Sequence, residues 1–134
     1  MSSRLRRENA VLYLDRNLGR RIVPEVLAKS CIVAEIHDDH LPQDAPDEAW
    51  ISLCSGKGWI AVTKDNQLRY NSPIRLAITN SKVAIFTITA KNLTGEQLGQ
   101  FIANNFDRLM RFCGHTKRPF LATISSHGHI VKVL

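Results

Sequence analysis

The sequence predicts an α/β fold with a mostly parallel central sheet. Short apolar runs rich in β-branched residues alternate with segments that have helical periodicity, and this alternation is typical of βαβ units. No repeat, low-complexity tract or Pro/Gly/Ser-rich linker interrupts the pattern, and 134 residues is the length of one ordinary domain. We therefore expect a single domain over residues 1–134, in which residues 1–9 form a flexible basic tail.

Four apolar runs are predicted to form the parallel strands, at residues 10–14, 31–36, 59–63 and 83–88. Near the end of the chain, "RPFLATI" and "HIVKVL" flank a turn at residues 125–128. Two extended runs separated by a short turn are typical of a hairpin. We place this C-terminal hairpin at one edge of the sheet.

Helical spacing predicts the connecting helices. The apolar residues between 22 and 27 share one helical face, on which Pro24 is tolerated only in the first turn. A shorter helix is expected within residues 71–80. Thr94 and Gln97 have the spacing of a capping box, and they start an amphipathic helix of about five turns that we expect to end at Gly114.

Composition points to a polyanionic partner. The formal net charge is +6 and the sequence pI is about 9.6, which makes nucleic acid the leading candidate. The three cysteines are widely spaced among apolar neighbours, so we expect buried, reduced thiols rather than disulfides or a metal knuckle. No apolar stretch approaches the length of a membrane span. We expect a cytoplasmic protein that does not interact with membranes.

Carboxylates follow two of the predicted strands directly. Asp15 comes after the run 10–14, and Asp65 comes after the run 59–63. Ligands of open parallel sheets bind beyond the carboxyl ends of the strands, so both acids are placed where a site is expected. The loop "LPQDAPDEAW" supplies a third candidate.

Helix geometry distinguishes Asp47 from Glu48 as that third acid. At about 100° per residue, the apolar residues from Ala49 to Cys54 form an arc that includes the position of Asp47 and excludes that of Glu48. Asp47 is therefore predicted to point inward, and Glu48 to meet solvent.

Three carboxylates at one edge repel one another, and a hard divalent cation that binds oxygen ligands relieves this repulsion. Mg²⁺ or Mn²⁺ fits best. The predicted metal ligands are Asp15, Asp47 and Asp65. Basic residues flank them and are predicted to bind phosphate or RNA: Arg16, Arg20, Lys64 and Arg69. An acidic centre surrounded by cations suits hydrolysis of a phosphodiester.

Structural roles compete with this interpretation. Asp15 and Asp47 could each cap a helix, and Asp65 could sit in a turn with Asn66. The run "HDDH", residues 37–40, invites a zinc site because two imidazoles and two carboxylates lie close together, but it lacks a distant fourth ligand. We favour the metal interpretation because three acids occupy matched positions in the predicted topology.

Three motifs resemble the PIN-like nuclease superfamily, and in particular its VapC-type toxins of bacterial toxin–antitoxin pairs: "YLDRNL", "PDEAW" and "VTKD". The resemblance covers nearly the whole chain. It implies a three-layer α/β/α sandwich, divalent-metal-dependent endoribonuclease activity, a cognate antitoxin and a possible homodimer. It assigns Asp15, Asp47 with Glu48 as its rival, and Asp65 as catalytic acids, with Asn17 and Thr63 in support.

One departure from the family pattern concerns a further acid that many members carry shortly after the third one. Here the corresponding positions hold Asn66, Gln67 and Asn71. An amide such as that of Asn66 can accept metal or orient water, but fewer charges weaken metal affinity. Two alternatives therefore stay open: a catalytically silent PIN-like module that binds RNA or protein, and a receiver-like phospho-acceptor domain.

Overall fold

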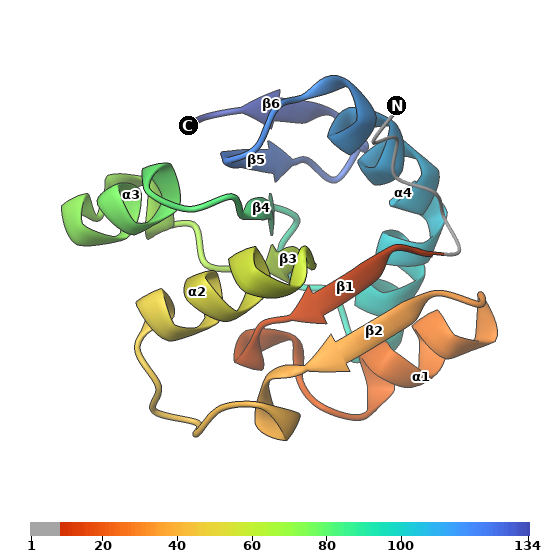
Figure 1. The fold of residues 1–134 in the computed structure, drawn as a ribbon. Coiled ribbons are helices and arrows are strands. Elements are labelled where there is room, and N and C mark those ends of the chain that lie inside the picture. Colours follow the sequence, from red (N-terminus) through yellow and green to blue (C-terminus); the bar gives the residue numbers. More distant parts are fainter. Residues whose placement is uncertain (1–8) are drawn as a thin grey trace.

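The computed structural model describes residues 9–134, and its core is one six-stranded sheet (Figure 1). The strand order is β2-β1-β3-β4-β5-β6; the first five strands are parallel, and β6 pairs antiparallel with β5. The strands are β1 (Val11–Leu14), β2 (Val33–Ile36), β3 (Ile60–Thr63), β4 (Ala84–Ile88), β5 (Phe120–Ile124) and β6 (Ile130–Lys132). The predicted basic tail lies, except for Asn9, outside the described residues.

Helices cover both faces of the sheet. One layer consists of α1 (Ile22–Lys29) and α4 (Gly95–His115), which pack against each other, and the other consists of α2 (Asp47–Lys57) and α3 (Ser72–Thr79). Figure 1 shows these two pairs on opposite sides of the strands. The predicted α/β fold, a three-layer sandwich with a mostly parallel sheet and a C-terminal hairpin, is confirmed.

Side-chain alternation along the strands divides the core into two clusters. In β1, Leu12 and Leu14 pack with the helices α1 and α4, whereas Tyr13 packs with α2 and α3. Tyr13 stacks on the buried ring of Trp50 at a centroid distance of 5.9 Å. Since successive strand residues face opposite sides, a strand covered on both faces is mostly apolar, as β1 (VLYL) is throughout.

Three details differ from the sequence expectations. Gly114 lies inside α4, which continues to His115, because no residue with positive φ ends this helix. The strand β2 starts at Val33 rather than at residue 31, because Cys31 adopts a left-handed conformation (φ 59°) after α1 and is exposed. Short 3₁₀ helices follow three strands and were not predicted: η2 (Arg16–Leu18), η3 (His37–Asp39) and η4 (Leu68–Tyr70).

The strand order creates a switch point between β1 and β3, which are neighbours. The chain leaves β1 toward β2 on one side and leaves β3 toward β4 on the other. Loops that diverge in this way open a crevice beyond the carboxyl ends of the two strands. Asp15 and Asp65 follow these strand ends. Within residues 9–134, no helix is long and apolar enough to cross a membrane.

Candidate active site

Asp15 is the buried carboxylate of the site, with only 4% of its surface exposed. Its Oδ1 accepts a hydrogen bond from the backbone N–H of Arg16 (2.8 Å), and its Oδ2 accepts one from the Thr63 hydroxyl (2.7 Å). Burial raises the pKa of Asp15 above its usual value, and the nearby charge of Asp47 adds to this, while the two hydrogen bonds oppose it. The hydrogen bonds within the protein therefore do not fully offset the cost of burying the charged Asp15 carboxylate.

Thr63 links Asp15 to the other strand-end residues. Its Oγ1 donates to Asp15 and accepts hydrogen bonds from the Asn17 side-chain amide and the Asp65 backbone N–H, each at 3.1 Å. The carbonyl oxygen of the Asn17 amide in turn accepts from the backbone of Lys64 at 3.2 Å. Five residues singled out in the sequence thus form one network that joins the ends of β1 and β3.

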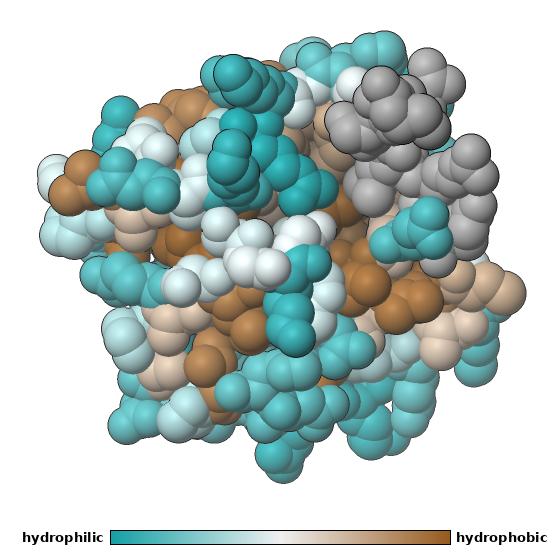
Figure 2. Space-filling view, viewed as in Figure 1, coloured by the Kyte–Doolittle hydropathy of each residue, from teal (hydrophilic) through white to brown (hydrophobic). Residues whose placement is uncertain are grey.

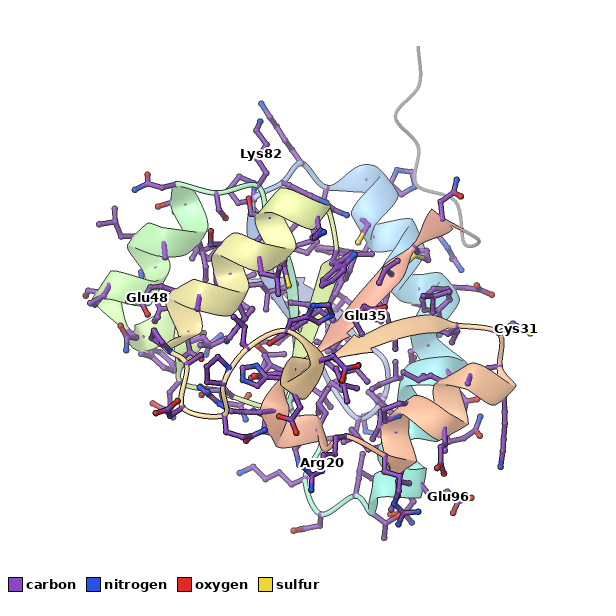
Figure 3. The ribbon with its side chains drawn as sticks, turned by 60° about the horizontal axis from the view of Figure 1, so that its bottom comes forward. Arg20, Cys31, Glu35, Glu48, Lys82 and Glu96 are labelled. Atoms are coloured by element: carbon purple, nitrogen blue, oxygen red, sulfur yellow. The ribbon has the colours of Figure 1, made fainter. Side chains whose placement is uncertain are left out.

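Asp47 reaches the same region from the first turn of α2. Its Oδ1 accepts a hydrogen bond from the indole N–H of Trp50 (2.8 Å) and lies 3.5 Å from the Arg16 guanidinium. The half-buried side chain of Asp47 agrees with the helix geometry that distinguished it from Glu48, which is exposed. Figure 3 shows Glu48 on a side of α2 remote from Arg20 and the end of β1.

Arg16 has a structural role that sequence reasoning missed. Besides its contact with Asp47, its guanidinium donates to the backbone carbonyls of Gln43 (2.5 Å) and Ala45 (2.7 Å). It thereby holds the loop before α2 against η2 and offsets part of the repulsion between the two acids. No sequence signal pairs residues that lie almost thirty positions apart. Phosphate binding by Arg16 stays a prediction, since these donors are already engaged.

Asp65 takes part in a turn of its own. Its Oδ1 accepts a hydrogen bond from the backbone N–H of Gln67 at 2.8 Å, the arrangement of an Asx turn. Asp65 is half-buried and Asn66 is exposed, and both line a cavity described below. Asp65 therefore does act as a turn residue, as the competing interpretation proposed, through its Oδ1. Its Oδ2 takes no part in that turn.

The remaining predicted cations lie at the surface of this edge. The Arg20 side chain is 77% exposed and its Nη1 lies 3.3 Å from Asp38 Oδ2; Lys64 is exposed as well. Arg69 contacts the ring of Tyr70. In Figure 2, the lower part of the molecule, toward which the arrowheads of β1 and β2 point, is mainly hydrophilic. The edge can therefore present cations to a polyanion.

Three residues of the "HDDH" segment, His37, Asp38 and His40, have hydrogen-bond or ion-pair partners within the protein. The Pro42 carbonyl can only accept, so His37 Nε2 donates to it (2.8 Å), and Nδ1 accepts from the Tyr13 hydroxyl (2.5 Å). His40 pairs with Glu35 at 2.7 Å, and Asp38 binds Arg20 and the Gln43 amide. Each of these groups is thus held by a partner that a metal would have to displace.

The donor chemistry fits a hard cation only in part. Across residues 9–134, no three His, Cys, Asp or Glu side chains lie close enough together to hold a metal ion. Asp15 and Asp47 do interact electrostatically, and both are oxygen donors of the type that Mg²⁺ and Mn²⁺ prefer. This pair could hold an ion whose other ligands are water. The predicted three-acid site that includes Asp65 stays a prediction.

Comparison with known proteins assigns the family. The model of the family described as "PIN like domain" matches residues 10–90, which include the acids at the ends of β1 and β3 and the start of α2. This chain belongs to the PIN-like family. It is 28% identical over 130 residues to the Mycobacterium tuberculosis (strain ATCC 25618 / H37Rv) protein named "Putative ribonuclease VapC45", covering 92% of this chain and 91% of that protein. No solved structure matches significantly.

The family assignment settles one of the open alternatives. A receiver-like phospho-acceptor domain is excluded as the family of this chain, although its sheet can share the order of the first five strands seen here. The resemblance to PIN-like nucleases of VapC type is confirmed.

Proposed function

We propose that this protein is an endoribonuclease that hydrolyses RNA phosphodiester bonds with Mg²⁺ or Mn²⁺. The observation that carries the proposal is the buried Asp15, bonded through Thr63 to Asn17 and Asp65 at the switch point of the sheet. The family and the ribonuclease name of its relative support the same reaction.

The residues of the chain have separate roles in this proposal. Asp15 and Asp47 would hold the cation, Asp65 would add negative charge beside them at the edge, and Thr63 and Asn17 keep Asp15 in position. When bound, the cation lowers the pKa of its water to make a nucleophile and stabilises the charge on the leaving oxygen. Arg20, Lys64 and Arg69 attract neighbouring phosphates, and no covalent intermediate with the protein is required.

The test is cleavage of a mixed pool of structured RNAs by the purified wild type and by Asp15→Asn, Asp47→Asn and Asp65→Asn. We expect cleavage with Mg²⁺ or Mn²⁺, none with EDTA, and losses of about 100-fold or more in the variants that remove a metal ligand. The matched control is Glu48→Gln, because this carboxylate neighbours Asp47 in sequence but faces solvent.

A second readout does not depend on activity. Mg²⁺ or Mn²⁺ should raise the thermal midpoint of the wild type, because a ligand that binds only the folded state stabilises it, and should leave the midpoint of Asp15→Asn unchanged. Folded wild type that neither cleaves RNA nor responds to either metal would support the catalytically silent binding module, which the missing fourth acid also favours.

We further infer that this protein is a toxin that forms a homodimer and is held inactive by a cognate antitoxin. Similarity to a relative carrying a VapC name supports this role. Controlled expression should arrest growth, Asp15→Asn should relieve the arrest, and co-expression of the gene adjacent to this one should do the same. Normal growth with abundant, cleavage-competent wild type would contradict the toxin role.

A further inference from the structure

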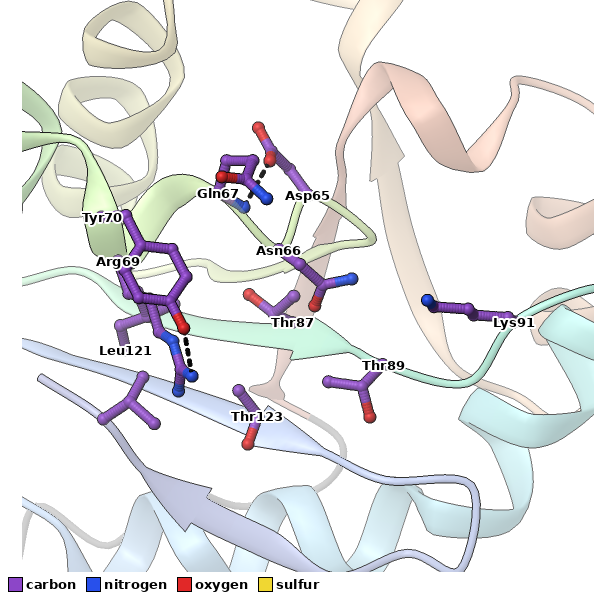
Figure 4. A pocket seen from close by; sticks show the side chains of 11 residues that line it. Asp65, Asn66, Gln67, Arg69, Tyr70, Thr87, Thr89, Lys91, Leu121 and Thr123 are labelled. Atoms are coloured by element: carbon purple, nitrogen blue, oxygen red, sulfur yellow. Dashed lines mark hydrogen bonds between the residues drawn. The ribbon is translucent and has the colours of Figure 1, made fainter.

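A cavity of about 450 Å³ adjoins the acidic centre on the face of the sheet that carries α2 and α3. Its described lining comes from the loop after β3, from η4 and from the strands β4 and β5 (Figure 4). Asp65 and Asn66 form the rim nearest to the acids. The cavity is therefore continuous with the proposed site, yet none of its remaining lining residues takes part in the network around Asp15.

A row of threonines leads from that network into the cavity. In the sheet register Thr63 pairs with Thr87, and Thr87 pairs with Thr123. Thr63 bonds Asp15, whereas Thr87 and Thr123 line the cavity. Two strand spacings make the row roughly 10 Å long. Hydroxyls at successive strands thus form a polar floor where apolar side chains would be expected inside such a sheet.

The aromatic ring of Tyr70 lines the cavity on the side opposite Lys91 (Figure 4). Tyr70 is 65% exposed, whereas Tyr13 and Trp50 are fully buried. The Arg69 guanidinium lies 4.8 Å from the centroid of the Tyr70 ring and donates to its hydroxyl. An exposed aromatic ring beside an arginine is the combination on which nucleic-acid bases stack.

Positive charge lies on both sides of the floor. Figure 4 shows Arg69 beside Tyr70 at one side, Lys91 at the other, and the threonines between them. The acid of the described lining is Asp65, and one of its oxygens is bonded to the Gln67 backbone. The lining therefore favours an anionic ligand that carries hydroxyls and a flat ring.

We propose that this cavity binds a nucleotide of single-stranded RNA next to the phosphate that is cleaved. Tyr70 stacks on the base, Lys91 and Arg69 contact the flanking phosphates, and Thr87 and Thr123 contact the sugar. The proposal rests on the proposed ribonuclease function, since the position of the cleaved phosphate is taken from it. An unpaired nucleotide is favoured because a base held in a duplex must first be unpaired and unstacked, at a cost in free energy, before it can stack on a side chain.

The test is anisotropy titration of a fluorescein-labelled, mixed-sequence, single-stranded RNA with the full-length Asp15→Asn variant in EDTA. Adding Tyr70→Ala should weaken binding by about 5- to 150-fold, the usual effect of removing one base-stacking ring. Tyr70→Phe keeps the ring and should retain the affinity. Leu76→Ala is the matched control, because Leu76 is 61% exposed on the neighbouring helix α3 but does not line the cavity.

Charge is tested with Lys91→Ala in the same background. It should lower the slope of log affinity against log salt by about 0.7, as expected for one phosphate contact to a single strand. The control is Lys82→Ala. Lys82 is exposed, and Figure 3 shows it at the end of the molecule opposite Arg20. Unchanged affinity for Tyr70→Ala together with an unchanged salt slope for Lys91→Ala would overturn the proposal.

The two proposals fail in different ways. If the wild type cleaves RNA and Tyr70→Ala binds and cleaves as the wild type does, the nucleotide site is wrong and the ribonuclease survives. If the wild type does not cleave but RNA binding depends on Tyr70, the cavity binds a nucleotide in a catalytically silent module.

Discussion

At the residue scale, the site depends on which groups stabilise the negative charge of one buried carboxylate. Asp15 receives two hydrogen bonds but remains short of positive charge, because the guanidinium of Arg16 is directed to Asp47 and to two backbone carbonyls. A buried anion without a full partner destabilises the folded state. Titratable groups perturbed in this way cluster at functional sites, and here a cation would complete the environment of Asp15.

The raised pKa of Asp15 leads to a prediction about stability and pH. The folded protein binds this proton more tightly than the unfolded chain, so the free energy of unfolding should fall as pH rises from the usual pKa of 3.8 to the higher folded value. Asp15→Asn removes this titration. In EDTA, urea unfolding over that range should show the variant gaining stability relative to the wild type as pH increases. A difference that is constant with pH would contradict the raised pKa.

Thr63 offers a second prediction at this scale. Thr63→Val keeps the shape of the side chain but leaves the buried Asp15 oxygen and the Asn17 amide without their partner. We expect a loss of about 1–3 kcal/mol in the free energy of unfolding, together with reduced RNA cleavage. Thr63→Ser keeps the hydroxyl and is the control. Equal stabilities of the two variants in urea unfolding would show that the hydroxyl network contributes nothing.

At the scale of elements, the close contact between α1 and α4 determines how the layer behind the acids is built. Gly99 of α4 faces Val26 of α1, and a Cβ added at Gly99 would lie 2.8 Å from the Val26 Cβ. A branched Cβ cannot rotate away, so the helices approach closely only because position 99 has no side chain. The capping box of Thr94 and Gln97 fixes where α4 begins.

Two glycines of the same helix are predicted to respond in opposite ways to alanine. Gly99→Ala should destabilise the protein by about 1–3 kcal/mol through overpacking against α1. Gly114→Ala should stabilise it, by up to about 1 kcal/mol, because its added Cβ meets no atom within 4 Å and alanine favours a helix. Thermal unfolding of both variants checks this, and a stabilised Gly99→Ala would show that the layer can move apart.

At the scale of the whole molecule, the net charge of +6 can attract RNA to the acidic centre only if the fold places cations near that centre. Arg20 and Lys64 lie exposed at the edge that holds the acids, while Lys82 lies at the opposite end. Cations near an acidic centre raise the local concentration of a polyanion without contacting the reacting atoms. The placement of charge therefore predicts which edge RNA approaches.

Salt dependence of RNA binding tests this placement. With single-stranded RNA, Arg20→Ala and Lys64→Ala should each lower the slope of log affinity against log salt by about 0.7, while Lys82→Ala should leave the slope unchanged. Affinities measured by anisotropy over a range of salt concentrations provide the slopes. An equal effect of all three substitutions would indicate non-specific attraction to the net charge alone.

The sequence by itself determined the α/β class, the four parallel strands, the terminal hairpin and the acids at the ends of β1 and β3. These features depend on local periodicity and on the fact that parallel strands end at a common edge. It also separated Asp47 from Glu48, since the angle between neighbouring residues of a helix is fixed by its geometry. The end of α4 was missed because a glycine signals a helix end only when the backbone there turns left-handed.

Only the tertiary structure decided which distant groups meet. Arg16 is held by carbonyls far along the chain, His37 is enclosed by Tyr13 and Pro42, and the threonine row depends on strand register. A trace of that row was visible in "IAVT", "AIFTI" and "FLATI", which each carry threonine as the fourth residue. Local sequence sets which face a side chain occupies, but register between strands is settled by packing of the entire sheet.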